Sequence, residues 1–339
     1  MSKTMQRWVM KDYGAQYLAL DDAPIPQPGP GEVLVKVSAV SINFRDKLIV
    51  ASGMGMPLKW PHTPGSDMAG EVVGTGPGVS RVNVGERVIS TFWSQWFDGA
   101  APFGVEALGS TLQGVLAEYV VLPQEDVVRA PQTLNDTEAS TLTCAGLTAW
   151  FALVETGRLH AGQTIVVQGT GGFALFAVQL AVAHGARVIV TSSSDEKLAR
   201  AKALGAVHGI NRRTHPDWAE QVLRLTDGRG ADHVLEMAGG DNLAQSVRAT
   251  APGGRISAVG VLDESKIENP VYRPILAKRL TLQGISVGHR RALEDLVQAV
   301  DRIGIKPVID AEYAFADLPK ALAHLDRGGF GKIVVRVAS

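Results

Sequence analysis

The stretch VVQGTGGFA, residues 166–174, constrains the fold of this chain more than any other stretch. It places Gly169, Gly171 and Ala174 in the pattern G-x-G-x-x-A, between an apolar run that predicts a strand and another that predicts a helix. The first glycine permits a tight turn, the second lets backbone N–H groups reach a pyrophosphate, and the small third residue lets helix and strand pack closely. The turn therefore predicts a dinucleotide site rather than a turn alone.

The middle of the chain alternates predicted strands and helices. TIVVQ (164–168) precedes the glycine turn, and RVIVT (187–191) precedes SSSDEKLARAKALG, where Ser193 and Glu196 have the spacing of a capping box and Gly205 ends the helix. Further predicted strands are ADHVLEM (231–237), RISAVG (255–260) and LTLQGIS (280–286). This alternation predicts a parallel sheet covered by helices on both faces.

The two ends of the chain predict a second, β-rich domain. A chain of 339 residues exceeds what one hydrophobic core usually organises. Short apolar runs separated by Gly and Pro occur at LVKVSAV (34–40), GEVVGTG (70–76), ERVIS (86–90) and AEYVVLP (117–123). We therefore expect residues 1–130 and 286–339 to form the β-rich domain, and residues 131–285 to form an inserted coenzyme domain.

Composition gives no indication of a nucleic-acid or membrane partner. Lys and Arg number 33 against 34 Asp and Glu, which gives no reason to expect nucleic acid or an anionic membrane surface. The longest apolar stretch, residues 173–183, is half the length of a bilayer span, so no membrane is predicted. The single cysteine forbids an intramolecular disulfide and fits a reducing compartment, which predicts a cytoplasmic location.

The end of the second coenzyme-domain strand favours NADP(H) over NAD(H). An acidic side chain at this point would accept hydrogen bonds from the ribose of NAD, but the chain has Ser192 and Ser193 there, followed by Lys197. Hydroxyls and a lysine suit a 2′-phosphate, whereas a carboxylate would repel it. Alternatively, the serines cap the next helix and Lys197 is a solvated surface residue. Arg212, after the third strand, is a further candidate for the adenine or phosphate.

Several motifs, in this order, resemble the medium-chain dehydrogenase/reductase superfamily, and within it the zinc-free, quinone-oxidoreductase-like branch. They are PGPGEVLVKVSAVSINFRD, PHTPGSDMAGEVVGTGPGVSRVNVGERV, LTCAGLTAW, VVQGTGGFALFAVQLA and ISVGHRRALEDL. The resemblance implies an α/β fold with a Rossmann doubly wound parallel sheet as the coenzyme domain and a β-rich, GroES-like catalytic domain. It also implies a homodimer joined through the coenzyme domains.

The resemblance also predicts that no zinc is bound. In the zinc alcohol dehydrogenases of the superfamily, three ligands hold the catalytic metal, and the matching positions here are Asn43, Ser66 and Cys144. Two of the three are therefore not zinc ligands, and one thiolate does not meet the needs of a catalytic zinc. The second zinc lobe of those enzymes would fall in residues 91–104, which contain no cysteine.

The candidate site residues fall into three groups. Asn43 could donate its amide N–H to a substrate oxygen or brace a loop, and Arg45 and Asp46 form either an ion pair or, through Arg45, a substrate contact. The predicted substrate pocket contains Ser66, Phe92, Trp93, Trp96 and Phe97, although the aromatic residues could instead pack a loop. The predicted coenzyme residues are Cys144, Thr148, Gly169, Thr170, Gly171, Gly172, Phe173, Ala174, Ser192, Ser193, Lys197, Arg212, Gly239, Gly240, Val259 and Gly260.

Together these features predict a zinc-independent, NADPH-dependent oxidoreductase that transfers hydride to a quinone, enone or other activated double bond. Such acceptors spread the developing charge through a π-system, so hydrogen-bond donors can replace a Lewis acid. The tyrosine that relatives often carry after the Asn43 segment is absent, so water is the expected proton donor. The alternatives are a metal-free carbonyl or alcohol oxidoreductase and a non-catalytic, crystallin-like NADPH-binding protein.

Overall fold

The computed structural model describes residues 4–260 and 269–337, and the chain divides into two compact units. Unit 1 contains Met1–Leu147 and Gly288–Ser339, and unit 2 contains Thr148–Val287. The first boundary differs from the one expected after residue 130. Helix α2 (Asp136–Ala139) and the π-helical turn η4 (Leu142–Gly146) pack against strands of the β-rich sheet, which keeps residues 131–147 with unit 1.

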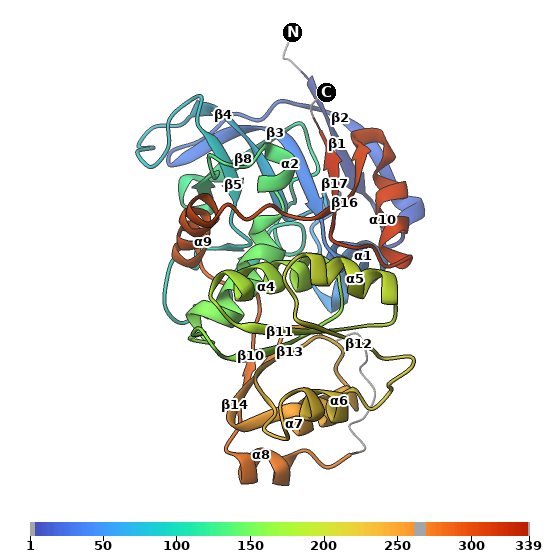
Figure 1. Cartoon of the computed structure of the whole chain (residues 1–339). Helices are drawn as coiled ribbons and strands as arrows, with labels where there is room; N and C mark the ends of the chain where they lie inside the picture. The colour runs from blue at the N-terminus through green and yellow to red at the C-terminus, as the bar shows by residue number, and fades with distance from the viewer. Residues whose placement is uncertain (1–3, 261–268, 338–339) are drawn as a thin grey trace. The chain divides into compact units, whose positions relative to one another are not determined.

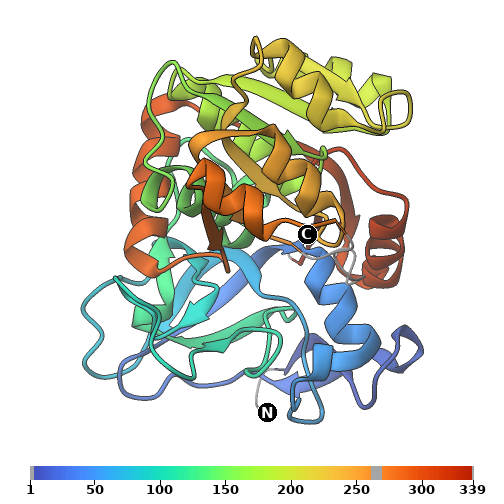
Figure 2. The same ribbon diagram turned by 90° about the horizontal axis from the view of Figure 1, so that it is seen from below.

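Unit 2 is a six-stranded parallel sheet in the order β12-β11-β10-β13-β14-β15. Helices α4 and α5 cover one face, and α6, α7 and α8 cover the other (Figure 1); Figure 2 shows α7 and α8 from below. This is the strand order of a Rossmann doubly wound sheet, so the predicted α/β fold class is confirmed. The strands are β10 (Thr164–Gln168), β11 (Arg187–Ser192), β12 (His208–Asn211), β13 (Ala231–Glu236), β14 (Thr250–Ala258) and β15 (Thr281–Gly284). The helices are α4 (Gly172–Ala183), α5 (Asp195–Ala203), α6 (Trp218–Leu225), α7 (Asn242–Ala249) and α8 (Tyr272–Lys278).

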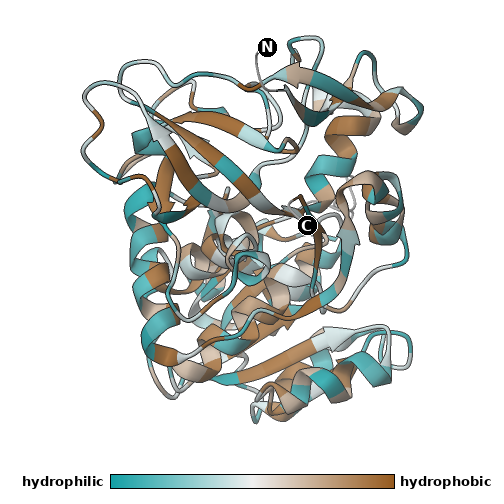
Figure 3. Cartoon of the chain, turned by 90° about the horizontal axis from the view of Figure 1, so that it is seen from above, coloured by the Kyte–Doolittle hydropathy of each residue, from teal (hydrophilic) through white to brown (hydrophobic). Residues whose placement is uncertain are grey.

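The interior strands of unit 2 are apolar because helices bury both of their faces. All five residues of β10 are buried, so its sequence TIVVQ does not alternate between apolar and polar positions. In Figure 3, brown, hydrophobic stretches lie on strands and on helices alike. Strand β10 has the predicted bounds, while β14 begins five residues earlier than RISAVG, at Thr250.

Unit 1 contains a seven-stranded sheet in the order β16-β17-β3-β4-β5-β9, with β8 also paired to β3. The long strand β3 pairs antiparallel with β4, β8 and β17, and Ile42 on β3 lies opposite Ile333 on β17. The strands are β1 (Thr4–Met10), β2 (Leu18–Pro24), β3 (Glu32–Ile42), β4 (Asp67–Thr75), β5 (Arg87–Ser90), β6 (Trp93–Ser94), β7 (Glu106–Ala107), β8 (Tyr119–Pro123), β9 (Val127–Arg129), β16 (Ile309–Ala314) and β17 (Lys332–Arg336).

The helices of unit 1 lie between these strands or after them. They include α1 (Phe44–Ser52), α9 (Arg290–Ile303) and α10 (Leu318–Asp326), while α3 (Leu147–Trp150) spans the boundary between the units. Short helical turns of unit 1 are η1 (Ala15–Tyr17), η2 (Gly53–Gly55), η3 (Gln124–Asp126) and η6 (Phe315–Asp317), while η5 (Phe151–Glu155) belongs to unit 2. Among the described residues, the structure contains no helix both long and apolar enough to span a membrane.

Candidate active site

The glycine turn between β10 and α4 leaves its backbone open. Gly169 has φ of +86°, which favours glycine, and its N–H donates to the Thr191 carbonyl on β11 at 2.8 Å. A Cβ added at Gly169 or at Gly171, the N-cap of α4, would meet no described atom within 4 Å. Ala174 is buried against the sheet, as expected for the third position of the motif. The cradle therefore fits a pyrophosphate bound by backbone N–H groups at the start of α4.

The cap of α5 differs by one residue from the predicted one. Ser194, not Ser193, is the N-cap, because its backbone is extended and its hydroxyl accepts from the Lys197 N–H at 3.3 Å. Ser192 is buried at the end of β11, and its hydroxyl accepts from the Ser194 N–H. The predicted capping-box pair of Ser193 and Glu196 is therefore wrong. This correction leaves Ser193 outside the cap, beside the strand end where a ribose phosphate is expected.

Basic and hydroxyl groups gather at this strand end. The backbone N–H of Arg212 donates to the Ser192 carbonyl at 2.8 Å, and the Arg212 side chain is exposed. The nearest carboxylate along the chain, Asp195, accepts a hydrogen bond from the Asn211 side chain at 2.9 Å. The structure thus brings Ser192, Ser193 and Arg212 to one edge of unit 2, with Lys197 in the first turn of α5.

The predicted residues after β13 and β14 lie at the same edge, because parallel strands end together. Gly239 and Gly240 follow β13 with φ of +80° and +50°, and Val259 and Gly260 follow β14. The register pairs the strand ends Glu236 and Ala258. Thr148, also expected near the coenzyme, is buried at the start of unit 2.

Sequence reasoning missed the polar network that supports the Gly239 turn. Glu236 is 2% exposed at the end of β13. It accepts hydrogen bonds from the backbone N–H groups of Ala238 and Gly239 and from the side chains of Gln168, Asn242 and Ser246. The available signal was an acidic residue at the end of the apolar strand ADHVLE, since a buried carboxylate requires donors.

In unit 1, Asn43 stands at the junction of β3 and α1. It is the N-cap of α1, and its backbone N–H donates to the Asp46 carboxylate at 2.7 Å, as in a capping box. Its side-chain Oδ1 accepts from Lys332 Nζ at 2.5 Å, and Lys332 also donates to the Ile42 carbonyl at 3.0 Å. Lys332 begins β17, beside β3, and it was not predicted as a site residue.

Asp67 lies in the same buried cluster. It accepts hydrogen bonds from the Ser66 hydroxyl at 2.6 Å and from the Cys144 N–H at 3.1 Å. Burial raises the pKa of Asp67, and the charge of Lys332 opposes that rise. Burial also raises the pKa of Asp46, to about 6, although Arg45 opposes the rise.

Arg45 connects this cluster to two of the predicted aromatic residues. Its Nη1 lies 3.7 Å from Asp46 Oδ1 and donates to the Leu108 carbonyl at 3.4 Å. Its guanidinium carbon lies 4.6 Å from the centre of the Phe92 ring, and Phe92 in turn packs edge to face against Trp93 at 5.0 Å. Phe92 and Trp93 therefore extend the cluster as an apolar wall.

The other two predicted aromatic residues pack at the start of α9. Trp96 lies edge to face against His289 at 5.6 Å, and the Arg290 guanidinium lies 4.7 Å from the centre of the Phe97 ring. Trp96 and Phe97 thus pack against residues at the start of α9, and their place in the substrate pocket stays a prediction.

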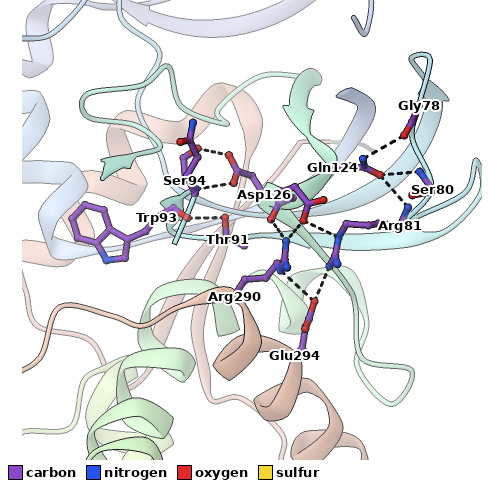
Figure 4. A network of polar contacts seen from close by, with 12 residues as sticks. Gly78, Ser80, Arg81, Thr91, Trp93, Ser94, Gln124, Asp126, Arg290 and Glu294 are labelled. Carbon is purple, nitrogen blue, oxygen red and sulfur yellow. Dashed lines mark hydrogen bonds and ion pairs between the residues drawn. The ribbon is translucent and has the colours of Figure 1, made fainter. Parts of the chain in front are cut away.

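A network of ion pairs and hydrogen bonds anchors this loop (Figure 4). The Ser94 hydroxyl donates to Asp126 at 2.6 Å, and the Gln95 N–H donates to the same carboxylate at 3.3 Å. Arg290 forms an ion pair with Glu125 next to Asp126. The loop that carries Phe92 and Trp93 is therefore held by side chains from both η3 and α9.

The three positions that match zinc ligands do not supply a suitable donor set. Asn43 Oδ1 already accepts from the Lys332 ammonium, and the Ser66 hydroxyl donates to Asp67. Cys144, the single cysteine of the chain, is the one conventional zinc ligand among the three positions. Within residues 4–260 and 269–337, no group of three or more His, Cys, Asp and Glu side chains could hold a metal ion. A catalytic zinc with three protein ligands does not fit these residues.

Two family models match the chain, one of a zinc-binding dehydrogenase over residues 172–303 and one of an alcohol dehydrogenase GroES-like domain over residues 29–132. A zinc-type alcohol dehydrogenase-like protein of Schizosaccharomyces pombe is 38% identical over 98% of this chain and 99% of its own length. The quinone oxidoreductase of Rattus norvegicus is 29% identical over 95% of this chain and 94% of its own length.

Solved structures are similar over both units. A Sinorhizobium meliloti 1021 protein assigned as an alcohol dehydrogenase is 56% identical, with a TM-score of 0.95 over 99% of this chain and 100% of its own. An NAD-dependent alcohol dehydrogenase is 32% identical, with a TM-score of 0.91 over 98% of this chain and 100% of its own.

Proposed function

The chain belongs to the medium-chain dehydrogenase/reductase superfamily, and on this premise we propose that it is a zinc-independent, NADPH-dependent reductase of quinones, enones or other activated double bonds. The observation that carries the proposal is the hydrogen bond from the Lys332 ammonium to Asn43 Oδ1. Asn43 occupies one of the three zinc-ligand positions, and its oxygen already binds a positively charged group there. The quinone oxidoreductase relative supports the substrate class.

The coenzyme binds unit 2 through two sets of groups. We propose that the backbone around Gly169 and Gly171 holds the pyrophosphate, with Thr170, Gly172, Phe173 and Ala174 completing the turn. The 2′-phosphate binds Ser192, Ser193, Lys197 and Arg212. The turns at Gly239, Gly240, Val259 and Gly260, together with Thr148, contact the nicotinamide half. Cys144 belongs to unit 1, and its predicted contact with the coenzyme stays a prediction.

The bound coenzyme supplies a hydride, and the residues of unit 1 orient the acceptor. The Asn43 Nδ2 group donates a hydrogen bond to the acceptor oxygen, where negative charge develops after hydride reaches the conjugated carbon. Phe92 and Trp93 pack against the planar acceptor, and Arg45 and Ser66 border its polar end. Water supplies the proton that completes the reduction, so each turnover consumes one hydride and one proton.

The direct test measures NADPH oxidation with a series of quinones and enones. We expect saturable turnover with at least one member of the series, and Asn43→Ala should lower kcat by on the order of a hundredfold, the usual cost of one oxyanion donor. Saturable NADPH binding without oxidation by any acceptor would instead support a non-catalytic, crystallin-like role.

Coenzyme preference can be tested at α5. Lys197→Glu should weaken NADPH binding by on the order of tenfold or more while changing NADH binding little, because the new carboxylate repels the 2′-phosphate. Lys202→Glu, in the last turn of the same helix, is the matched control and should change neither. Equal losses for both coenzymes would contradict the NADP assignment.

The second candidate is a metal-free alcohol or carbonyl oxidoreductase. It is favoured by the 56% identity to the Sinorhizobium meliloti protein assigned as an alcohol dehydrogenase. NADP⁺ reduction by simple alcohols, unaffected by a chelator, would select it. Chelator-sensitive turnover with about one zinc per chain would contradict both metal-free proposals.

We also propose a homodimer formed through unit 2. Strand β15 is the edge of the six-stranded sheet, and all four of its residues are exposed. Leu282 on β15 is 45% exposed, and Tyr272 and Leu276 on α8 are 74% and 60% exposed. Leu282→Lys should therefore yield monomers in light scattering. A cytoplasmic location stays a prediction from the single cysteine.

A further inference from the structure

Lys332 is a buried cation without a direct ion pair. It is 4% exposed, and it is the one buried lysine in the described part of the chain. Burying a charge is costly unless hydrogen bonds compensate it. Its Nζ has two acceptors, the Ile42 carbonyl and Asn43 Oδ1, and no carboxylate of a described residue lies within 4.0 Å of it. One of its two partners is therefore the amide that we propose as the substrate donor.

The contact between Lys332 and Asn43 fixes the orientation of the amide. An ammonium group only donates, so the Asn43 atom that faces it must be Oδ1, and Nδ2 must point elsewhere. The Asn43 side chain acts on the Asp67 carboxyl as a hydrogen-bond donor and so opposes the rise in the pKa of that carboxyl, which means that Nδ2 faces Asp67. Asn43 is 9% exposed, and no contact of Nδ2 with a described acceptor meets full hydrogen-bond geometry. Because an amide nitrogen carries two protons, Nδ2 keeps a second proton for a ligand atom when the first is directed at Asp67.

We infer that Lys332 is a positioning residue for the reaction: its ammonium holds the Asn43 amide with Nδ2 available to the substrate oxygen and polarises the amide N–H bond. The inference rests on the proposed function, in which Asn43 binds the developing negative charge. Electron density drawn toward Oδ1 makes the Nδ2 protons more positive, so the hydrogen bond strengthens most when the acceptor oxygen becomes an anion. Lys332 therefore acts on the reaction through Asn43, without touching the acceptor.

Lys278 provides a matched control for a purely structural lysine. It is in α8 of unit 2, and its Nζ donates to the backbone carbonyls of Val247, Arg248 and Thr250 at 2.8 to 3.0 Å. These carbonyls belong to the end of α7 and the start of β14. Lys278→Met should therefore lower stability and leave kcat unchanged.

The test is a double-mutant cycle between Lys332 and Asn43. We expect Lys332→Met to lower kcat by about tenfold or more, with NADPH affinity changed less than about twofold. In the Asn43→Ala background, Lys332→Met should lower kcat by less than about twofold, because the amide through which it acts is gone. Lys332→Gln provides a second, uncharged variant, so the cycle does not depend on the folding of one protein. Equal losses in both backgrounds, or no loss in either, would overturn the inference.

A readout without substrate separates this inference from the proposed function. The side-chain amide of Asn43 can be assigned by NMR from the signal that Asn43→Ala removes. We expect Lys332→Met to shift that signal and Lys278→Met to leave it in place. An unchanged Asn43 signal in Lys332→Met would overturn the inference, whereas absence of turnover in the wild-type protein would count against the proposed function alone.

Discussion

Each unit buries a carboxylate beside its candidate site, but the two carboxylates are satisfied differently. In unit 2, Glu236 accepts from two backbone N–H groups and three side chains. In unit 1, Asp67 accepts from one hydroxyl and one backbone N–H and interacts with the Asn43 side chain. Asp46 Oδ1 lies 3.7 Å from Arg45 Nη1, and neither it nor Asn43 Nδ2 has a partner with full hydrogen-bond geometry among the described residues. Full hydrogen bonding holds a backbone turn in place, whereas partly paired groups keep hydrogen-bonding capacity for a ligand.

The largest expected effect is the loss of stability when the hydrogen-bonded carboxylate of Glu236 is removed from unit 2. Glu236→Ala should destabilise unit 2 by more than about 4 kcal/mol, because five donors on buried or half-buried residues lose their shared acceptor. Urea unfolding of the variant measures this loss. Glu220→Ala, which removes only the exposed ion pair with Arg224, is the control and should cost less than about 1 kcal/mol. If the two variants lost similar amounts of unfolding free energy, the hydrogen bonds of Glu236 would contribute no more than an exposed ion pair.

The Cys144 thiol probes the electrostatics of the unit 1 cluster. Its pKa of about 12, raised mainly by burial and then by Asp67, should make alkylation near neutral pH about a thousandfold slower in the native protein than in the unfolded chain. Mass spectrometry of iodoacetamide labelling in the presence and absence of urea measures the two rates. A chelator should leave the native rate unchanged. Acceleration by the chelator would reveal a metal thiolate instead.

Asp46 should make the stability of unit 1 depend on pH. Burial raises its pKa from 3.8 to about 6 in the folded protein, against the opposing charge of Arg45. The stability that Asp46 contributes is therefore fully present below pH 3.8 and is lost as the pH rises through 6, a change of about 3 kcal/mol.

Comparison with Asp46→Asn isolates the pH-dependent contribution of the Asp46 carboxyl to stability. Asparagine keeps an acceptor for the Asn43 N–H but does not titrate in this range, so its stability relative to wild type should rise between about pH 4 and pH 7. Denaturant unfolding at both pH values provides the measurement. A pH-independent difference would mean that Asp46 keeps its ordinary pKa.

The smallest expected effect separates two adjacent serines in unit 2. Ser194→Ala should cost about 1 kcal/mol because its hydroxyl caps α5, whereas Ser193→Ala should cost a few tenths at most. Thermal unfolding of the two variants distinguishes them. For coenzyme binding the order should reverse, with Ser193→Ala weakening NADPH more than NADH. Equal losses of thermal stability in the two variants would mean that Ser193 caps α5 as well as Ser194 does.

The sequence predicted unit 2 better than the cluster in unit 1. The turn at Gly169 could be recognised because its strand, glycines and helix are consecutive, and local spacing determines its backbone geometry. The Lys332–Asn43 contact joins residues 289 positions apart, so only the pairing of β3 with β17 reveals it. The capping residue of α5 was misplaced because three consecutive serines offer the same chemistry, and only the backbone conformation distinguishes them.

The aromatic residues show a similar limit. Phe92, Trp93, Trp96 and Phe97 form one cluster in the sequence, but their neighbours divide them between Arg45 and the start of α9. Irregular spacing in a loop gives no period from which side-chain direction can be inferred. For this reason, only the three-dimensional structure distinguishes Phe92 and Trp93, which lie beside Arg45, from the two aromatic residues beside α9.

The pairing of β17 with β3 also determines when, during synthesis, the contact between Lys332 and Asn43 can form. Asn43 leaves the ribosome long before Lys332, and the whole dinucleotide-binding unit is translated between them. A nascent chain can therefore expose a complete coenzyme unit while the Asn43 amide still lacks its lysine. Under the proposed function, the reaction therefore reaches its full rate only after β17 has emerged and joined the sheet, when synthesis is nearly finished.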